Sequence, residues 1–265
     1  FKLAVSVLVV MNQLVKLTFA FSTFAVMYNA TASNTVNKTK QNQISQKFIQ
    51  IQIDQNVTIG RAIKTMVEHY PQKAASIVDI ALDLYPLKYK EIIHAAISAK
   101  PTLADEVVTM ALDKKLSSCA SIVETAINAD PSYIDFVVTA AASSTPAQLS
   151  EIVRIAVITE PDSADYIVQS LAKAHPSKIV DILKSAIIAV PFVGEYVVEA
   201  LLAVFPDDAE ILITTAVRES SAKRENVKRI IEIAQNSGID QDKLEVYALN
   251  GGATTEELSE ILGDN

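Results

Sequence analysis

All nine prolines of the chain fall in one register of 15 residues. Successive prolines are 15 residues apart, except where Leu116 stands in place of a proline and the interval doubles to 30. The series is Pro71, Pro86, Pro101, Pro131, Pro146, Pro161, Pro176, Pro191 and Pro206. A fixed period of this kind is typical of a repeat array, whose short units are stable only when they stack on their neighbours.

The pattern within one unit is helical. Counting the proline as position 0, apolar residues recur at positions 3, 6, 7, 10, 11 and 14, as in Ile179, Ile182, Leu183, Ala186, Ile187 and Val190. These spacings place the side chains on one stripe of an α-helix. Because proline suits the first turn of a helix, each unit predicts a helix of about 11–12 residues that begins at its proline. Asp130 and Thr145, each just before a proline, are expected to cap the helices that follow.

The units alternate between two kinds, which we call the first and second helix types. Position 3 is mostly small in the first type and mostly larger in the second, as in Ala74, Ala104, Ile134, Ala164 and Gly194 against Tyr89, Cys119, Leu149, Ile179 and Ala209. Two non-equivalent helices per 30 residues predict antiparallel hairpins stacked side by side. In this architecture residues 56–220 resemble HEAT and armadillo arrays. We expect an all-α solenoid of about ten 15-residue helices, in five two-helix repeats, between N- and C-terminal capping helices.

The first 32 residues are strongly apolar and allow two interpretations. One is a transmembrane anchor, because the apolar stretch is long enough to span a bilayer. The one we favour is a secretory signal that starts at Met11, with a short basic segment, an apolar stretch and a small-x-small cleavage pattern ending at Ala32. The mature chain then begins at Ser33, and we expect export to the periplasm or the exterior of a bacterial cell.

Residues 33–55 form a polar tract that we interpret as a linker. Within it, the alternation over residues 48–53 predicts either a strand or the start of a capping helix. Residues 57–70 follow the repeat register weakly, as an atypical terminal repeat does.

Residues 221–265 are more polar and contain glycines at the expected ends of helices. They predict C-terminal capping helices that cover the open end of the stack, or alternatively a separate binding module. Thr254 and Glu257 have the spacing of a capping box.

Charge and motifs argue against several classes of function. The net charge of −8 disfavours nucleic acid as a partner, because phosphate binding needs a clustered cationic face. The single cysteine, Cys119, lies on the apolar stripe and is expected to be a buried thiol. His69, His94 and His175 lack metal-ligand spacing, and no nucleophile elbow, Walker loop or dinucleotide fingerprint occurs. We therefore expect no enzyme, no cofactor and no metal site, although the sequence does not exclude paired acids for glycoside chemistry.

Two sets of residues opposite the apolar stripe are candidates for binding. Position 5 of the first helix type carries an aromatic ring in consecutive repeats: Phe136, Tyr166 and Tyr196. Such rings predict a stacking ladder for a peptide or polysaccharide, or alternatively packing against the next hairpin. Position 4 carries an acid: Asp105, Asp135, Asp165 and Glu195. These acids predict a solvated stripe, or alternatively a docking surface for a basic partner.

The second helix type carries acids at position 5, namely Glu91, Glu151 and Asp181. Equivalent helices of adjacent hairpins lie about 8–10 Å apart, which is too wide for two carboxylates to share a calcium ion. Its position 8 is mixed in sign, as is typical of a solvated face: His94, Glu124, Arg154 and Lys184.

The sequence thus predicts an exported, non-enzymatic interaction scaffold. Its partner would be a protein, peptide or polysaccharide held over an extended surface. Two alternatives stay open, namely a self-assembling structural subunit of an extracellular filament or envelope layer, and a polysaccharide-processing enzyme. A membrane association follows only if the N-terminal segment is not cleaved.

Overall fold

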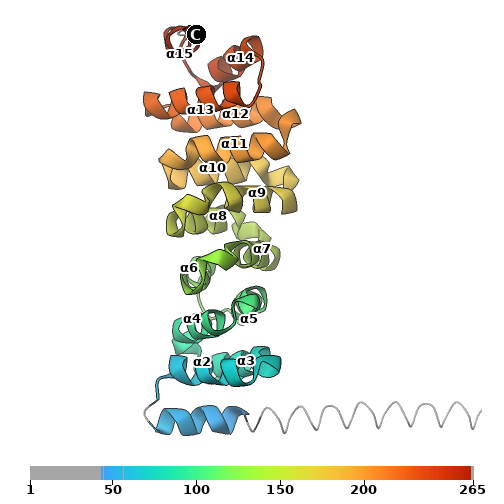
Figure 1. Ribbon diagram of the computed structural model, residues 1–265, viewed down its shortest axis with the longest axis vertical. Helices are drawn as coiled ribbons and strands as arrows, with labels where there is room; N and C mark the ends of the chain where they lie inside the picture. Colours follow the sequence, from blue (N-terminus) through green and yellow to red (C-terminus); the bar gives the residue numbers. More distant parts are fainter. Residues whose placement is uncertain (1–42, 44, 56, 264–265) are drawn as a thin grey trace, which may run out of the picture.

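The computed structural model describes residues 43, 45–55 and 57–263. All regular elements of this part are helices, and they pile up in chain order along one long axis (Figure 1). The expectations about a signal or anchor in residues 1–32 lie outside the described residues. No helix of the described part is both long enough and apolar enough to cross a bilayer.

The helices form two layers. The even layer consists of α2 (Ile59–His69), α4 (Tyr89–Ala99), α6 (Cys119–Ala129), α8 (Leu149–Thr159), α10 (Ile179–Ala189), α12 (Ala209–Ser220) and α14 (Gln241–Gly251). The odd layer consists of α3 (Ala74–Leu84), α5 (Ala104–Asp113), α7 (Ile134–Ser144), α9 (Ala164–Ala174), α11 (Gly194–Val204) and α13 (Arg224–Asn236). Each helix packs against the next helix of its own layer and against its sequence neighbours in the other layer, as in an α-solenoid.

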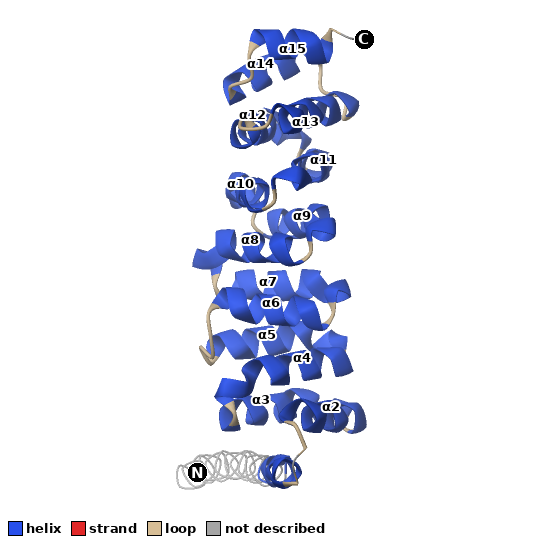
Figure 2. Cartoon of the chain, turned by 90° about the vertical axis from the view of Figure 1, so that its left-hand side faces the viewer, coloured by secondary structure: helices blue, strands red, loops and turns tan. Residues whose placement is uncertain are grey.

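The helix axes turn progressively along the stack. In Figure 1 the helices around α11 lie across the view while α5 and α7 are seen nearly end-on, and in the perpendicular view of Figure 2 the two groups exchange appearance. A small rotation at each repeat accumulates in this way and gives the array a superhelical surface.

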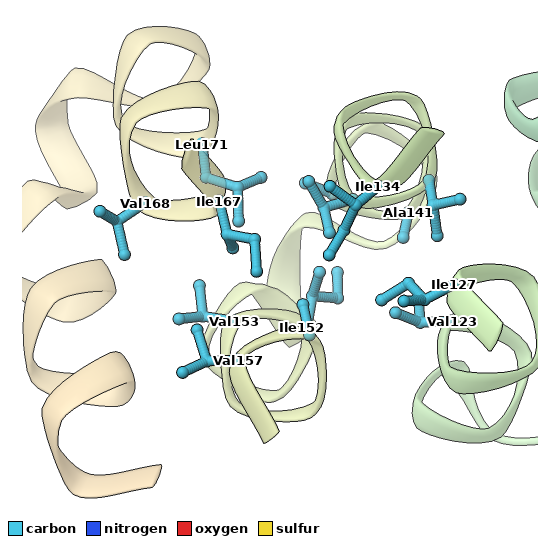
Figure 3. Close-up of a cluster of buried hydrophobic side chains, with 14 of the residues drawn as sticks. Val123, Ile127, Ile134, Ala141, Ile152, Val153, Val157, Ile167, Val168 and Leu171 are labelled. Carbon is cyan, nitrogen blue, oxygen red and sulfur yellow. The ribbon is translucent and has the colours of Figure 1, made fainter. Parts of the chain in front are cut away.

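The core confirms the predicted apolar stripe. Side chains at positions 6, 7, 10 and 11 of both layers point between the layers and are almost all fully buried. Figure 3 shows this packing around α8, where Ile152 lies on the side of Ile134 of α7. Val153 and Val157 lie on the other side, toward α9 with Ile167. The 11-residue helices are therefore held mainly by tertiary packing, since isolated helices of this length are marginal in water.

The prolines begin short 3₁₀ turns, and the α-helices start three residues later. The turn from Pro176 to Lys178 is representative, with α10 following at Ile179. The residue before each proline is held out of the α region, as at His175 with φ −133° and ψ 64°. The Lys178 N–H then donates to the His175 carbonyl at 2.9 Å. Each of these α-helices thus starts one 3₁₀ turn after its proline, and not at the proline as the sequence predicts.

The two expected caps differ. The Asp130 carboxylate accepts the Ser132 N–H at 3.1 Å, as predicted. The prediction that Thr145 caps the following helix is wrong. Its hydroxyl donates to the carbonyl of Ala141 in the preceding helix, at 2.9 Å, and makes no cap hydrogen bond. This backward bond satisfies the threonine within the preceding helix.

The connection at Leu116, where the register lacks a proline, has its own geometry. Lys115 adopts a left-handed conformation with φ 53°. The Leu116 N–H donates to the Ala111 carbonyl at 3.3 Å, which ends α5 in a Schellman-type turn. The Ser118 hydroxyl then accepts the Ser121 N–H at 3.3 Å and caps α6. A helix end and a serine cap thus replace the proline turn.

Replacing Leu116 by the proline that the repeat pattern requires is expected to destabilise the chain. Proline removes the N–H that bonds to Ala111 and disfavours the left-handed conformation of Lys115. We expect Leu116→Pro to lower the free energy of unfolding, measured by urea denaturation, by about 2 kcal/mol. Glycine adopts the left-handed conformation without steric cost, so Lys115→Gly in the same turn should raise the free energy of unfolding by about 0.5 kcal/mol. A more stable Leu116→Pro variant would contradict this account.

The two ends of the array depart from the expected arrangement of caps. Residues 45–54 form a helix, which decides between the two predictions for residues 48–53. At the other end α13 packs on α11 and α14 packs on α12, so both helices continue the layers. The last helix, α15 (Thr255–Leu262), packs against α13 and α14 and begins with the predicted capping box at Thr254. Helices α3 to α12 correspond to the ten predicted solenoid helices, and the difference is that α13 and α14, which were expected to be caps, extend the two layers.

Candidate functional site

The predicted aromatic residues lie on the outer surface of the odd layer. Phe136, Tyr166 and Tyr196 come from α7, α9 and α11, and each is about half exposed, at 53%, 50% and 54%. The Phe136 ring also packs against Tyr133, with ring centroids 5.5 Å apart. Each side chain is thus partly buried and partly available to a ligand.

The predicted acids lie in the first turns of α5, α7, α9 and α11, and in the last three of these helices an aromatic ring is the next residue. Carboxylates in a first turn interact favourably with the helix dipole, which provides a structural reason for the stripe. The Asp135 carboxylate also accepts a hydrogen bond from the Ser170 hydroxyl, and Glu195 pairs with Arg229 at 3.1 Å. Asp105 and Asp165 are exposed. The four acids are therefore in different environments and do not converge on one site.

Between α9 and α11 the structure brings some of these residues into a cleft of about 240 Å³. Asp162 and Asp165 line one side, and Phe192 and Tyr196 line the other. The sequence prediction did not include Asp162 or Phe192. Both stand at position 1, which faces away from the apolar stripe like position 5, so the pattern contained a signal for them.

A second cavity lies on the even layer, and we call it the N-terminal groove. It has a volume of about 700 Å³ and crosses α2, α4 and α6. It is lined by Gly60, Arg61, Lys64, Lys90, Glu91, His94, Ala95, Ser98, Glu124, Thr125 and Asn128. Each of these helices contributes charged residues to the same opening, and α6 contributes Glu124 together with the uncharged Thr125 and Asn128.

Small side chains leave room for the N-terminal groove. In α4, positions 9 and 12 are Ala95 and Ser98, whereas in α8 the same positions are Ile155 and Ile158. Because helices of one layer repeat the same positions side by side, the outer side chains at these positions are smaller on α4 than on α8. The volume of the groove thus depends on residues that the apolar stripe does not include.

The cations of the N-terminal groove have no ion-pair partner among the residues that the structure describes. Within the described residues, no acidic group forms a salt bridge with Arg61, Lys64 or Lys90. Glu91 of the groove is already paired with Lys88 at 2.7 Å. These three positive charges are therefore available to a ligand.

Two cations farther along the even layer, Arg154 and Lys184, are paired. Arg154 donates two hydrogen bonds to Glu151, at 2.7 and 2.6 Å. These bonds lower the pKa of the Glu151 carboxyl and raise the pKa of Arg154. Lys184 pairs with Glu219 at 3.1 Å. Position 8, whose mixed charges the sequence indicated to be typical of a solvated face, thus carries paired cations in α8 and α10 and lines the N-terminal groove in α4 and α6.

Cysteine and histidine residues occupy separate places in the stack. Cys119 is 5% exposed, and burial raises the pKa of its thiol. His94 lies in the N-terminal groove with its Nδ1 atom 3.4 Å from the Ser98 hydroxyl, and the Nδ1 atom of His69 lies 2.8 Å from the Thr65 carbonyl. Across the described residues, no three His, Cys, Asp or Glu side chains gather closely enough to hold a metal ion.

The array therefore presents two surfaces that differ in chemistry. The odd layer exposes aromatic rings and carboxylates, and the even layer contains the N-terminal groove with its three unpaired cations. Comparison of the chain with protein-family models, curated protein sequences and solved structures finds no match. Function is accordingly inferred from the geometry and charges of these surfaces.

Proposed function

We propose that the chain is a non-enzymatic scaffold that binds a protein or peptide partner over an extended surface. The observation that supports this proposal is the N-terminal groove, which is open to solvent and takes its lining from three successive helices of one layer. Helices packed in this way lie about 8–10 Å apart, so a ligand that reaches from α2 to α6 spans roughly 20 Å. An extended peptide covers that distance with about six residues.

The stack itself suits this role. Its binding surface is formed before the partner arrives, so little of the binding free energy is lost in ordering the scaffold. We also propose that the array is HEAT- or armadillo-like in architecture, and that it works in the periplasm or outside a bacterial cell. The second part of this proposal rests on the signal pattern of residues 11–32.

A selection from a random peptide library on the purified full chain tests the scaffold function. We expect enriched peptides that bind with micromolar dissociation constants, as is usual for short extended ligands. Ser98→Ile tests whether these peptides bind in the N-terminal groove. Isoleucine is already present at the same repeat position in α8, so we expect the helix to accept it. It fills the groove and should weaken groove-binding peptides by about tenfold, with the free energy of unfolding changed by less than about 0.5 kcal/mol. A library without enrichment over the bare support would overturn the proposal.

A structural subunit is the second candidate, and exposed apolar side chains at both ends of the stack favour it. At the N-terminal end Phe48, Ile51 and Tyr70 are 43%, 50% and 55% exposed. On α14, near the other end, Val246 and Leu249 are also exposed. End-to-end contact between copies would remove this apolar surface from water.

Sedimentation velocity over a range of concentrations tests end-to-end assembly. If the chain is a structural subunit, its mean sedimentation coefficient rises with concentration. Phe48→Lys combined with Ile51→Lys is then expected to abolish the rise, because two charges would be buried at the contact. A wild-type chain that stays monomeric at high concentration would rule out this second candidate and leave the scaffold proposal intact.

A further inference from the structure

We infer that the N-terminal groove binds an extended acidic segment of a partner protein, with the carboxylates of that segment over Arg61, Lys64 and Lys90. This inference rests on the proposed scaffold function and adds the chemical class of the ligand. It depends on three properties of the groove, namely unpaired cations, uneven charge and the absence of aromatic rings among its lining residues.

The first property is the cluster of unpaired cations. Arg61 and Lys64 lie one turn apart on α2, and Lys90 lies on the neighbouring helix α4. All three are exposed, and none forms a salt bridge with a described residue. Three unpaired cations on two adjacent helices attract an anionic ligand to the groove, although the chain as a whole has a net charge of −8.

The second property is the uneven distribution of charge across the groove. The α2 and α4 side carries the three cations, and Lys88 offsets the charge of Glu91 there. The α6 side instead carries Glu124, which has no salt bridge in the described part, and the amide of Asn128. A matching ligand therefore has carboxylates at one end and, about six residues away, a basic or amide side chain.

The composition of the groove favours a peptide over other polyanions. A nucleic acid backbone carries continuous negative charge, which Glu91 and Glu124 would repel and which three cations neutralise only in part. Sugars are commonly held by stacking on aromatic rings, and no aromatic side chain lines the groove. Ser98, Thr125 and Asn128 instead supply the small polar groups that suit a peptide backbone.

The direct test is fluorescence polarisation with a labelled octapeptide that has glutamates at its first three positions and a lysine at its last. The comparison peptide has glutamines in place of the glutamates. We expect the full chain to bind the acidic peptide at least about tenfold more tightly, and we expect this preference to shrink as salt is raised.

A pair of charge-matched variants locates the site. Arg61→Glu with Lys64→Glu reverses two charges of the groove and should lower the affinity for the acidic peptide by at least about tenfold. Lys173→Glu with Lys243→Glu makes the same change in net charge at exposed positions outside the groove and should change the affinity by less than about threefold. Circular dichroism of both variants checks that the exposed substitutions leave the helices folded.

Several outcomes would overturn the inference. Equal loss of affinity in the two double variants means that the attraction is general and the groove is not the site. Equal affinity for the acidic and glutamine peptides means that the ligand class is wrong. If the random library yields peptides that do not compete with the acidic octapeptide, the scaffold function stands and the acidic-segment inference fails. If the library yields nothing and the octapeptide does not bind, both fail.

Discussion

Ile152→Ala is expected to lower the free energy of unfolding by about 3–4 kcal/mol. Ile152 is fully buried at the centre of the stack, on α8, where side chains from α7 and α9 surround it (Figure 3). Truncation to alanine removes apolar contacts and leaves a cavity that neighbouring helices close only in part. Because every helix is stabilised by its neighbours, the loss at a central helix is expected to weaken the coupling between the two halves of the array.

The matched control for this prediction is Ile158→Ala in the same helix. Ile158 is 44% exposed and stands at position 12, outside the apolar stripe. Its truncation should cost less than about 1 kcal/mol in the same urea titration, because less apolar surface returns to water and no cavity forms. Similar losses for the two variants would mean that the core does not lie between the layers as described.

Gly251→Ala is expected to lower the free energy of unfolding by about 2–3 kcal/mol, although alanine is the better helix former. Gly251 is buried at the end of α14, where that helix meets α12. A β-carbon there would lie 2.7 Å from the Val217 β-carbon and 2.9 Å from the Thr214 carbonyl oxygen. Both neighbours belong to the packed even layer, so α14 must move away, and α15 with it.

Gly194→Ala provides the control for the glycine prediction. A β-carbon at Gly194 meets its nearest neighbour, the Ile230 side chain, at 3.5 Å, which is ordinary contact. Alanine stands at the same position in α3, α5 and α9. The free energy of unfolding of this variant should therefore rise by about 0.5 kcal/mol. Hydrogen exchange measures the difference directly, with faster exchange in α14 and α15 expected for Gly251→Ala alone. Unchanged exchange there would contradict the close packing of Gly251.

Much of the fold follows from local rules that can be applied to the sequence. The spacing of residues such as Ile182 and Leu183 determines which side of each helix is buried, because only one stripe can face the other layer. The prolines mark the connections, but proline is equally compatible with the first turn of an α-helix and with a 3₁₀ turn. The sequence prediction therefore placed the helix starts three residues too early. The sequence shows that Leu116 replaces a proline of the repeat, but it does not show the left-handed turn at Lys115.

The surfaces were harder to predict, because their environment depends on neighbours about 30 residues away in the chain. Glu195 and Asp135 have the same position in the repeat, but one pairs with Arg229 and the other accepts a hydrogen bond from Ser170. The pattern placed both acids on one stripe and contained no information about these partners.

The sequence by itself thus determined the helical repeat, the buried stripe and the proline connections, since each depends on residues within one unit or its neighbours. Only the tertiary structure decided where the charged groove opens, because its small side chains and its unpaired cations come from different helices that meet only in the packed layer. Ala95 and Ser98 make room, and Arg61, Lys64 and Lys90 provide charge, although α2 and α4 are separated in sequence by the whole of α3. Packing in layers brings these residues together, and repeat patterns in one dimension do not contain that information.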